Sequence, residues 1–182
     1  MGYALAAVAR DMGAEVTLIS GPVALQPVPG CRMVNVITTA EMLAAVEKEY
    51  NIHDMLIMAA AVADFQPVQS GGDKIPRASR PSSLDLQSTP DILKAIRKRF
   101  TGTLVAFSLQ AGSDLVPARK KLKDKGAEFI VVNRYDEPGA GPEADQNHVW
   151  VLSASGDEVE IPLGTKQAVA KRILEEILRG ST

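Results

Sequence analysis

Short apolar runs that alternate with helical patterns along most of the chain limit the fold more than any other feature of this sequence. The apolar runs match buried parallel strands in length and composition and lie at 16–19, 54–62, 103–109 and 128–133. Apolar positions at helical spacing predict helices, which lie at 1–12, 40–50, 90–99 and about 113–125. Strands separated by helices are typical of an α/β protein with a doubly wound, mostly parallel sheet and helices on both faces.

The end of the chain departs from this alternation. The stretches NHVWVLS (147–153) and DEVEIPL (157–163) predict a two-stranded hairpin that turns across 155–157. Thr165 is then expected to cap a last helix that runs to about Arg179. The earlier helices also have start signals, which are Thr39 for 40–50, Thr89 with Pro90 and Asp91 for 90–99, and Ser113 or Asp114 for 113–125.

Length and composition limit the class of protein. The chain has 182 residues, enough for one domain with a sizeable core, and its 46% hydrophobic and 23% charged residues are ordinary for a soluble globular protein. A net charge of −2 argues against a general nucleic-acid binder, and no run of about 18 apolar residues predicts a membrane span. The single Cys31 allows no internal disulfide and no signal peptide is recognisable, so a cytoplasmic location is expected.

The predicted topology indicates where a ligand would bind. In a doubly wound sheet the ligand lies at the carboxyl ends of the strands, so functional residues should follow Ile19, Ala61, Leu109 and Asn133. The polar stretch 64–83 is too long for an idle connection and is a candidate lid. The first helix is followed by a strand but not preceded by one, although a crossover needs both. We therefore expect that a central strand and the loop after it are missing and that the chain is truncated at its N-terminus.

Charged residues near the strand ends are the candidates for chemistry. Asp64 ends AAAVAD, where a carboxylate could accept a hydrogen bond from a ligand or simply cap a loop. Lys74, with Arg77 close behind, could close over phosphates or be a solvated loop lysine. Lys121 and Lys125 lie one turn apart on one helix face, which suits either a triphosphate or a solvated amphipathic helix.

The familiar phosphate-binding and catalytic patterns are absent from the sequence. Neither G-x-G-x-x-G nor G-x-x-x-x-G-K-[ST] occurs, which disfavours a Rossmann-type oxidoreductase and a P-loop protein. His53 and His148 have no nucleophile or metal-ligand partner at motif spacing. The residues alone therefore predict an α/β protein with an anion-binding site at the strand ends, and they leave its reaction open.

Several stretches taken together resemble one known family. They are MGYALAAVARDMGAEVTLISGPV, AAAVADFQP followed by DKI, TPDIL, VAFSLQA and the two spaced lysines. In content and order they are similar to phosphopantothenoylcysteine synthetase, the ligase half of the bacterial bifunctional coenzyme A biosynthesis protein. The resemblance covers nearly the whole chain and implies one Rossmann-like domain over 1–182, a flap at about 65–83 and a homodimer.

The resemblance also implies a reaction and its partners. CTP with Mg²⁺, or ATP as in eukaryotic relatives, would activate the carboxylate of 4'-phosphopantothenate as an acyl nucleotidylate and release pyrophosphate. Cysteine would then attack through its amine to give the amide and CMP. A flavin-dependent decarboxylase domain, fused or associated, is a further expected partner, whereas nucleic acid and membranes are not expected.

The family's functional residues map onto positions in this chain. Lys74 matches the flap lysine that is important for forming the intermediate, so the resemblance makes it the catalytic candidate as well as a nucleotide ligand. The other residues implied to bind the nucleotide are Ala60, Asp64, Pro90, Asp91, Ile92, Leu93, Phe107, Lys121 and Lys125. Fixed cations at the phosphates would stabilise the charge that develops during carboxylate activation. No metal ligand is identified.

Some positions depart from the family pattern. Gln110 stands where the family has Glu, Ala106 replaces a Gly, and Pro76 with Arg77 replaces a more basic stretch. The family also has a strand and a loop with an N-x-S-S-G motif before the residue that matches Met1, so its catalytic Asn would lie upstream. These departures keep open a second hypothesis, which is a nucleotide-binding homologue or fragment without ligase activity.

Overall fold

A five-stranded mixed sheet forms the centre of the molecule in the computed structural model, which describes residues 1–68, 83–136, 139, 141 and 144–180. The strands follow the order β3-β6-β7-β8-β9. Their bounds are Met55–Met58 for β3, Thr103–Gln110 for β6, Phe129–Arg134 for β7, Gln146–Ser153 for β8 and Glu158–Thr165 for β9. β3, β6 and β7 run parallel, whereas β8 and β9 form the predicted antiparallel hairpin at the edge.

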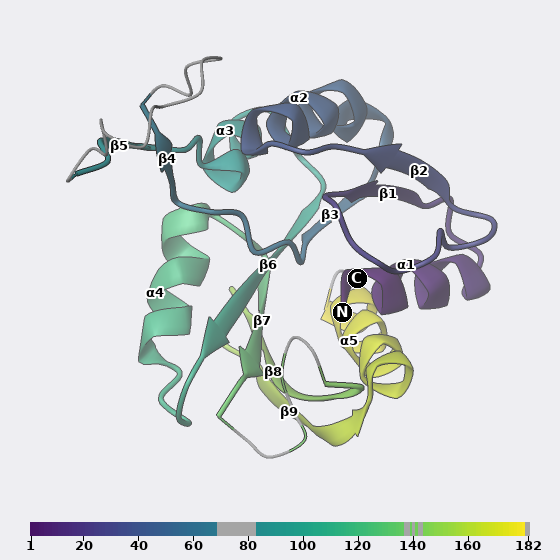
Figure 1. Ribbon diagram of the computed structural model, residues 1–182. Coiled ribbons are helices and arrows are strands. Elements are labelled where there is room, and N and C mark those ends of the chain that lie inside the picture. Colours follow the sequence, from purple (N-terminus) through teal and green to yellow (C-terminus); the bar gives the residue numbers. More distant parts are fainter. Residues whose placement is uncertain (69–82, 137–138, 140, 142–143, 181–182) are drawn as a thin grey trace.

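Helices cover both faces of this sheet, as the doubly wound prediction requires (Figure 1). One face packs against α2 (Thr39–Glu49), α3 (Ile92–Arg97) and α4 (Val116–Lys125). The other face packs against α1 (Gly2–Asp11) and α5 (Lys166–Gly180), which also contact each other. Along β6 the buried side chains alternate between the two faces, since Leu104 and Ala106 belong to the first core cluster and Val105 to the second.

A second, two-stranded parallel sheet lies beside the first, between α1 and α2 (Figure 1). It pairs β1 (Thr17–Ser20) with β2 (Arg32–Asn35). In the part of the chain that the structure describes, neither strand is hydrogen-bonded to β3. β2 is not among the strands predicted from the sequence. The strand begins with exposed Arg32, ends with exposed Asn35 and contains no apolar run. Its pairing with β1 therefore defines it as a strand.

Two helix starts differ from the prediction by one or two residues. α2 is capped by Thr38 and not by Thr39, because Thr38 Oγ1 accepts the backbone N–H of Glu41 at 3.1 Å and the Glu41 carboxylate accepts the N–H of Thr38 at 3.2 Å. α3 begins after Asp91 and not after Thr89, because the Asp91 side chain accepts the N–H of Lys94 at 3.2 Å. A short 3₁₀ turn, Tyr50–Ile52, follows α2.

Of the other two cap predictions, only that of Thr165 agrees with the structure. The N-cap residue of α4 is Leu115, which makes no side-chain cap bond, and Asp114 lies one residue earlier, where its Oδ1 accepts the N–H of Val116 at 2.9 Å. Thr165 Oγ1 accepts the N–H of Ala168 at 3.3 Å in the first turn of α5. Both are local side-chain to backbone bonds of the kind that sequence position alone can predict.

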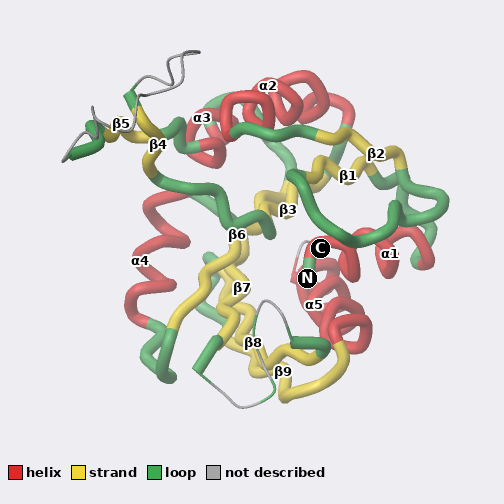
Figure 2. Tube along the Cα trace, viewed as in Figure 1, coloured by secondary structure: helices red, strands yellow, loops and turns green. Residues whose placement is uncertain are grey.

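The predicted strand 54–62 is too long, because β3 ends at Met58. The small residues that follow leave the sheet and run as a loop to a short antiparallel ribbon (Figure 2). The ribbon pairs β4 (Phe65–Pro67) with β5 (Leu86–Ser88) and stands at the edges of the predicted lid. Residues 69–82 of that predicted lid, including Lys74, Pro76 and Arg77, lie outside the described residues. None of the described helices has the length and apolar character needed to cross a membrane.

Candidate active site

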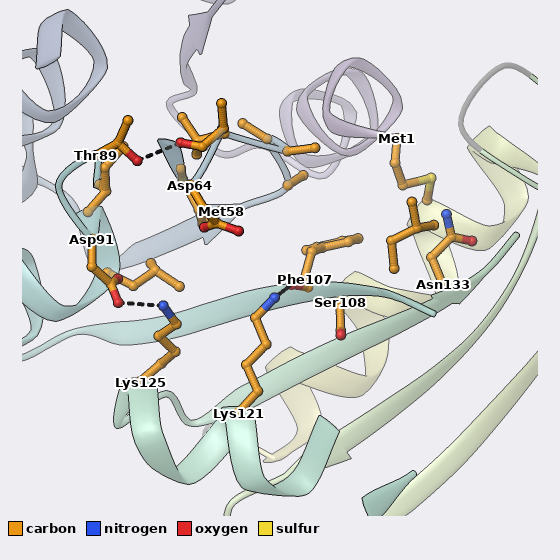
Figure 3. A pocket seen from close by; sticks show the side chains of 18 of the residues that line it. Met1, Met58, Asp64, Thr89, Asp91, Phe107, Ser108, Lys121, Lys125 and Asn133 are labelled. Atoms are coloured by element: carbon orange, nitrogen blue, oxygen red, sulfur yellow. Dashed lines mark hydrogen bonds and ion pairs between the residues drawn. The ribbon is translucent and has the colours of Figure 1, made fainter. Parts of the chain in front are cut away.

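A pocket of about 460 Å³ opens at the carboxyl ends of β3, β6 and β7. Its walls come from the loop 59–64 after β3, the segment 89–93 that leads into α3, the end of β6, the inner face of α4 and the end of β7. This volume and position are typical of small-molecule sites in parallel α/β proteins. Figure 3 shows side chains from these separate segments facing one space.

The structure brings nearly all of the predicted site residues together. The pocket is lined by Ala60, Asp64, Pro90, Asp91, Ile92, Leu93, Phe107, Lys121 and Lys125. Ile92 and Leu93 are buried and also belong to the core beneath α3. They therefore form the apolar floor of the pocket and offer a ligand no polar side chain. Lys74 lies outside the described residues. Functional residues were also expected after Ile19, at the end of β1. The described residues that line this pocket include none from that position.

Asp91 links two helices at the pocket edge. One carboxylate oxygen caps α3 through the N–H of Lys94, and the other accepts a hydrogen bond from Lys125 Nζ at 2.6 Å. Burial raises the pKa of Asp91, but the hydrogen bond from Lys125, the cap bond and the two nearby lysine charges outweigh it and hold the pKa below its ordinary value. Asp91 is therefore ionised near neutral pH and holds the Lys125 ammonium at the pocket.

Lys121 presents a second ammonium group deeper in the same wall. Its Nζ donates to the backbone carbonyl of Phe107 at 2.9 Å. Burial, followed by the charge of Lys125, lowers the pKa of Lys121, while Asp64 and Asp91 oppose this shift. An anionic ligand placed between the two lysines would relieve their repulsion, so this wall is suited to phosphate or carboxylate groups.

Thr89 is a pocket residue whose role the sequence analysis assigned differently. Its hydroxyl donates to the carbonyl of Ala63 at 2.5 Å, and its backbone N–H donates to the carbonyl of Asp64 at 2.9 Å. These two bonds tie the loop after β3 to the segment that enters α3. Thr89 therefore fixes the backbone on both sides of the pocket instead of capping the helix.

Four polar lining residues were not among the predicted site residues. They are Ser108 at the end of β6, Asn133 at the end of β7, Asn147 at the start of β8 and Lys166 at the start of α5. Ser108 and Asn133 had a signal, since each lies at the end of a predicted strand on the ligand side of the sheet. Asn147 and Lys166 reach the pocket through tertiary packing, which a reading of local patterns does not contain.

No group of three or more His, Cys, Asp or Glu side chains able to hold a metal ion occurs in the described part of the chain. Two carboxylates, Asp64 and Asp91, line the pocket. Asp91 is engaged by Lys125, whereas Asp64 makes no side-chain hydrogen bond or ion pair within the described residues. Mg²⁺ is commonly bound through one or two carboxylates together with substrate phosphates, and this donor set fits that mode.

Fold and pocket define the class: a doubly wound α/β domain with a cation-lined ligand site at the carboxyl ends of its parallel strands. A family model for the DNA/pantothenate metabolism flavoprotein C-terminal domain (DFP) matches residues 1–180. The chain belongs to this family. The resemblance predicted from the sequence motifs is thereby confirmed, together with the fold class.

Similar proteins agree with this assignment. The chain is 38% identical over 181 residues to a protein of an unknown prokaryotic organism named cysteine/cysteine sulfinic acid decarboxylase, covering 98% of this chain and 50% of that protein. It is 40% identical over 189 residues to the coenzyme A biosynthesis bifunctional protein CoaBC of Mycolicibacterium smegmatis, covering 97% of this chain and 45% of that one. The chain thus spans about half the length of the curated relatives it matches.

A solved structure of the C-terminal domain of CoaBC is similar throughout. It superposes with a TM-score of 0.80 at 35% sequence identity, over 97% of this chain and 79% of that chain. The likeness therefore includes the central sheet, the covering helices and the segments that form the pocket.

Proposed function

We propose that this domain is a phosphopantothenate–cysteine ligase of coenzyme A biosynthesis that uses CTP. The observation that carries the proposal is the convergence of Asp64, Asp91, Lys121 and Lys125 on one pocket at the strand ends. The relationship to CoaBC proteins and to the C-terminal CoaBC domain supports the same reaction class.

In the proposed reaction a carboxylate oxygen of 4'-phosphopantothenate attacks the α-phosphorus of CTP, and pyrophosphate leaves. The cysteine amine then attacks the acyl carbon, loses a proton and displaces CMP. Lys121 and Lys125, which line the pocket, are proposed to neutralise nucleotide phosphates, where negative charge increases in the transition state. Lys74 is proposed as the flap lysine of this step, by family position alone.

Asp64 is proposed to contact the nucleotide base or sugar, or to hold Mg²⁺ with the phosphates. Bound Mg²⁺ would supply charge neutralisation at those phosphates. The protein's own contribution is to fix the two ammonium groups, Lys121 on the Phe107 carbonyl and Lys125 on Asp91, before the substrate arrives. This preorganisation removes much of the cost of arranging charges during the reaction.

A homodimer and a decarboxylase partner domain are proposed from the family relationship. The bifunctional name of the CoaBC relatives and their twofold greater length support the second proposal.

A second candidate function is a nucleotide-binding homologue without ligase activity. The observation that favours it is the position of Gln110, which replaces a family Glu. Its Nε2 donates to the carbonyl of Asp114 at 2.7 Å, and it is not among the described residues that line the pocket. The side chain at this position is thus engaged in holding the turn before α4.

The test uses the complete natural gene product that contains these 182 residues. Release of pyrophosphate and CMP is measured with 4'-phosphopantothenate, cysteine and either CTP or ATP. The ligase proposal predicts release that requires both co-substrates and is faster with CTP. Calorimetric binding of CTP or ATP without product under these conditions would favour the second candidate, and failure of both nucleotides to bind would overturn both candidates.

A further inference from the structure

The ribbon of β4 and β5 continues into a clamp at the edge of the pocket, and Thr89 forms this clamp. The last ladder pair of the ribbon joins Phe65 to Ser88. One residue further along, the backbone N–H of Thr89 donates to the carbonyl of Asp64 at 2.9 Å, which continues the same register. The Thr89 hydroxyl donates to the carbonyl of Ala63 at 2.5 Å. Together these two bonds extend the ribbon into the loop that follows β3.

The loop after β3 depends on the clamp for its position. Its sequence is AAAVAD (59–64), in which Ala59 and Val62 pack against the two core clusters while the remaining four residues are exposed. Within the described part of the chain, both hydrogen bonds that join this loop to another segment come from Thr89. Without the hydroxyl, a single backbone bond would hold the exposed end of the loop.

The Thr89 hydroxyl is not needed to begin α3. The cap of that helix is Asp91, whose carboxylate accepts the N–H of Lys94 at 3.2 Å. Pro90 stands between the two residues and restricts Thr89 to an extended conformation, which suits the ribbon. Valine has nearly the same shape as threonine and fits an extended segment equally well. The bond to Ala63 is therefore what explains a hydroxyl at this position.

The segment 89–91 joins the two sides of the charged end of the pocket (Figure 3). On one side Thr89 holds the backbone of Asp64, and on the other side Asp91 accepts a hydrogen bond from Lys125 Nζ at 2.6 Å. Pro90, between them, has a φ angle fixed by its ring. The segment therefore sets the spacing between the Asp64 backbone and the lysine wall of the pocket.

The backbone position of Asp64 matters because its carboxylate has no other restraint. The side chain is exposed at the pocket and makes no hydrogen bond or ion pair with another described residue. Burial, followed by the charge of Lys125, lowers the pKa of Lys121, and the Asp64 charge opposes this shift, so the carboxylate acts on the same space. A displacement of about 1 Å in a group that contacts a ligand can be costly.

We infer that Thr89 is a positioning residue, whose hydroxyl places the Asp64 carboxylate for nucleotide binding. This inference rests on the proposed function, in which the nucleotide is CTP and Asp64 contacts its base or sugar or the bound Mg²⁺. The hydroxyl hydrogen of Thr89 is committed to the Ala63 carbonyl, so its effect on the ligand passes through the loop 59–64.

The experiment compares Thr89→Val with Thr89→Ser in the complete natural gene product. Valine keeps the shape of the side chain and removes the hydroxyl, whereas serine keeps the hydroxyl. Thr38→Val is the matched control, because it also removes a hydrogen-bonded hydroxyl, at the cap of α2, and Thr38 is not among the described residues that line the pocket. For each variant, thermal unfolding, the KM values for CTP and 4'-phosphopantothenate and the calorimetric Kd for CTP are measured.

Thr89→Val is expected to raise the KM and Kd for CTP about fivefold, the effect of losing one neutral hydrogen bond, while the KM for 4'-phosphopantothenate stays within about twofold. Thr89→Ser should bring the CTP values back to within about twofold of the wild type, because the donor is kept. Thr38→Val should lower the unfolding temperature and leave both KM values unchanged.

A double-mutant cycle tests whether Thr89 acts through Asp64. Asp64→Asn removes the charge that the clamp positions, so adding Thr89→Val to it should weaken CTP binding by less than about twofold more. A full fivefold further loss in that background, on the order of the single variant's effect, would show that Thr89 acts independently of Asp64 and would overturn the inference.

Wild-type affinity for CTP in Thr89→Val would overturn the inference and leave the ligase proposal intact. Equal rises in both KM values that serine does not reverse, with an unfolding temperature lowered as in Thr38→Val, would mean a structural role and would also overturn it. Wild-type protein that binds CTP but releases no product would overturn the ligase proposal, and calorimetry on the same variants would still decide the role of Thr89. Absence of CTP binding by the wild type would overturn both.

Discussion

The bond between Asp91 and Lys125 leads to a prediction about stability that does not depend on the reaction. Asp91 caps α3 with one oxygen and binds Lys125 Nζ at 2.6 Å with the other. Asp91→Ala removes both interactions, Asp91→Asn keeps a capping oxygen but removes the ion pair, and Lys125→Met removes only the ion pair. The three variants, with the double variant Asp91→Asn/Lys125→Met, therefore separate the two contributions.

The magnitudes follow from the geometry. Loss of an Asp cap costs about 1 kcal/mol. The ion pair has side chains 22% and 34% exposed, so solvent weakens it and its contribution is about 1 kcal/mol at most. Asp91→Ala should therefore lower the free energy of unfolding by about 2 kcal/mol, and Asp91→Asn or Lys125→Met by about 1 kcal/mol. In a domain of this size, about 2 kcal/mol corresponds to a melting temperature lower by roughly 4–8 °C.

The effect should depend on pH with a definite sign. The folded state lowers the pKa of Asp91 below 3.8, so its charge stabilises the fold at pH values above the unfolded pKa. This contribution is lost as the pH falls through the lowered folded pKa, where the carboxylate takes up a proton. The difference between wild type and Asp91→Asn should therefore be full at neutral pH and shrink in acid, below about pH 4.

Urea unfolding followed by circular dichroism at neutral and acidic pH measures these differences. The double-mutant cycle should give a coupling of up to about 1 kcal/mol between the two side chains. Strictly additive effects in the cycle would show that the ion pair contributes nothing. Equal losses for Asp91→Ala and Asp91→Asn would refute the assignment of Asp91 as the cap of α3.

Three further substitutions test other parts of the structure. Gly102→Ala would place a Cβ 2.3 Å from the backbone oxygen of Asp54 and should destabilise the protein by about 2 kcal/mol or more in urea unfolding; wild-type stability would contradict the close approach. Thr38→Ala should cost about 1 kcal/mol in the same assay through loss of the α2 cap, and no loss would argue against it. Lys121→Met should weaken CTP binding in calorimetry by about tenfold or more, since a charged hydrogen bond is lost, while exposed Lys120→Met should not.

The doubly wound architecture could be predicted from the sequence because its signals are local. Apolar runs at 103–109 and 128–133 predict strands regardless of how the rest of the chain packs. The spacing of Lys121 and Lys125 alone predicts that they share one helix face. Their common pocket then follows from topology, since parallel strands present their carboxyl ends at one edge. The structure places both lysines there.

Features that depend on distant partners could not be read in this way. β2 exists because Arg32–Asn35 pairs with β1, and its own sequence has no strand pattern. The start of α3 offered Thr89 and Asp91 as caps two residues apart, and the local sequence fits either. Asp91 also binds Lys125, which lies 34 positions further along the chain. The Thr89 hydroxyl instead donates to the carbonyl of Ala63, which precedes β4, the partner strand in the ribbon.

One error could have been avoided with local information. Glu41 stands three residues after Thr38, which is the spacing of a capping box and selects Thr38 over Thr39. The Glu41 carboxylate accepts hydrogen bonds from the backbone N–H groups of Ile37 and Thr38, and these bonds also lower the pKa of Glu41. Asn147 and Lys166 are different, because only the return of β8 and β9 to the sheet brings them to the pocket.

The separation of β1–β2 from the five-stranded sheet has a consequence for cooperativity. A two-stranded sheet is only marginally stable by itself, so β1 and β2 depend on the packing of α1 and α2. β6 and β7, by contrast, are bonded on both sides and buried on both faces. β1 and β2 are therefore expected to open locally at a lower free energy than the central strands β6 and β7, while the central sheet stays folded.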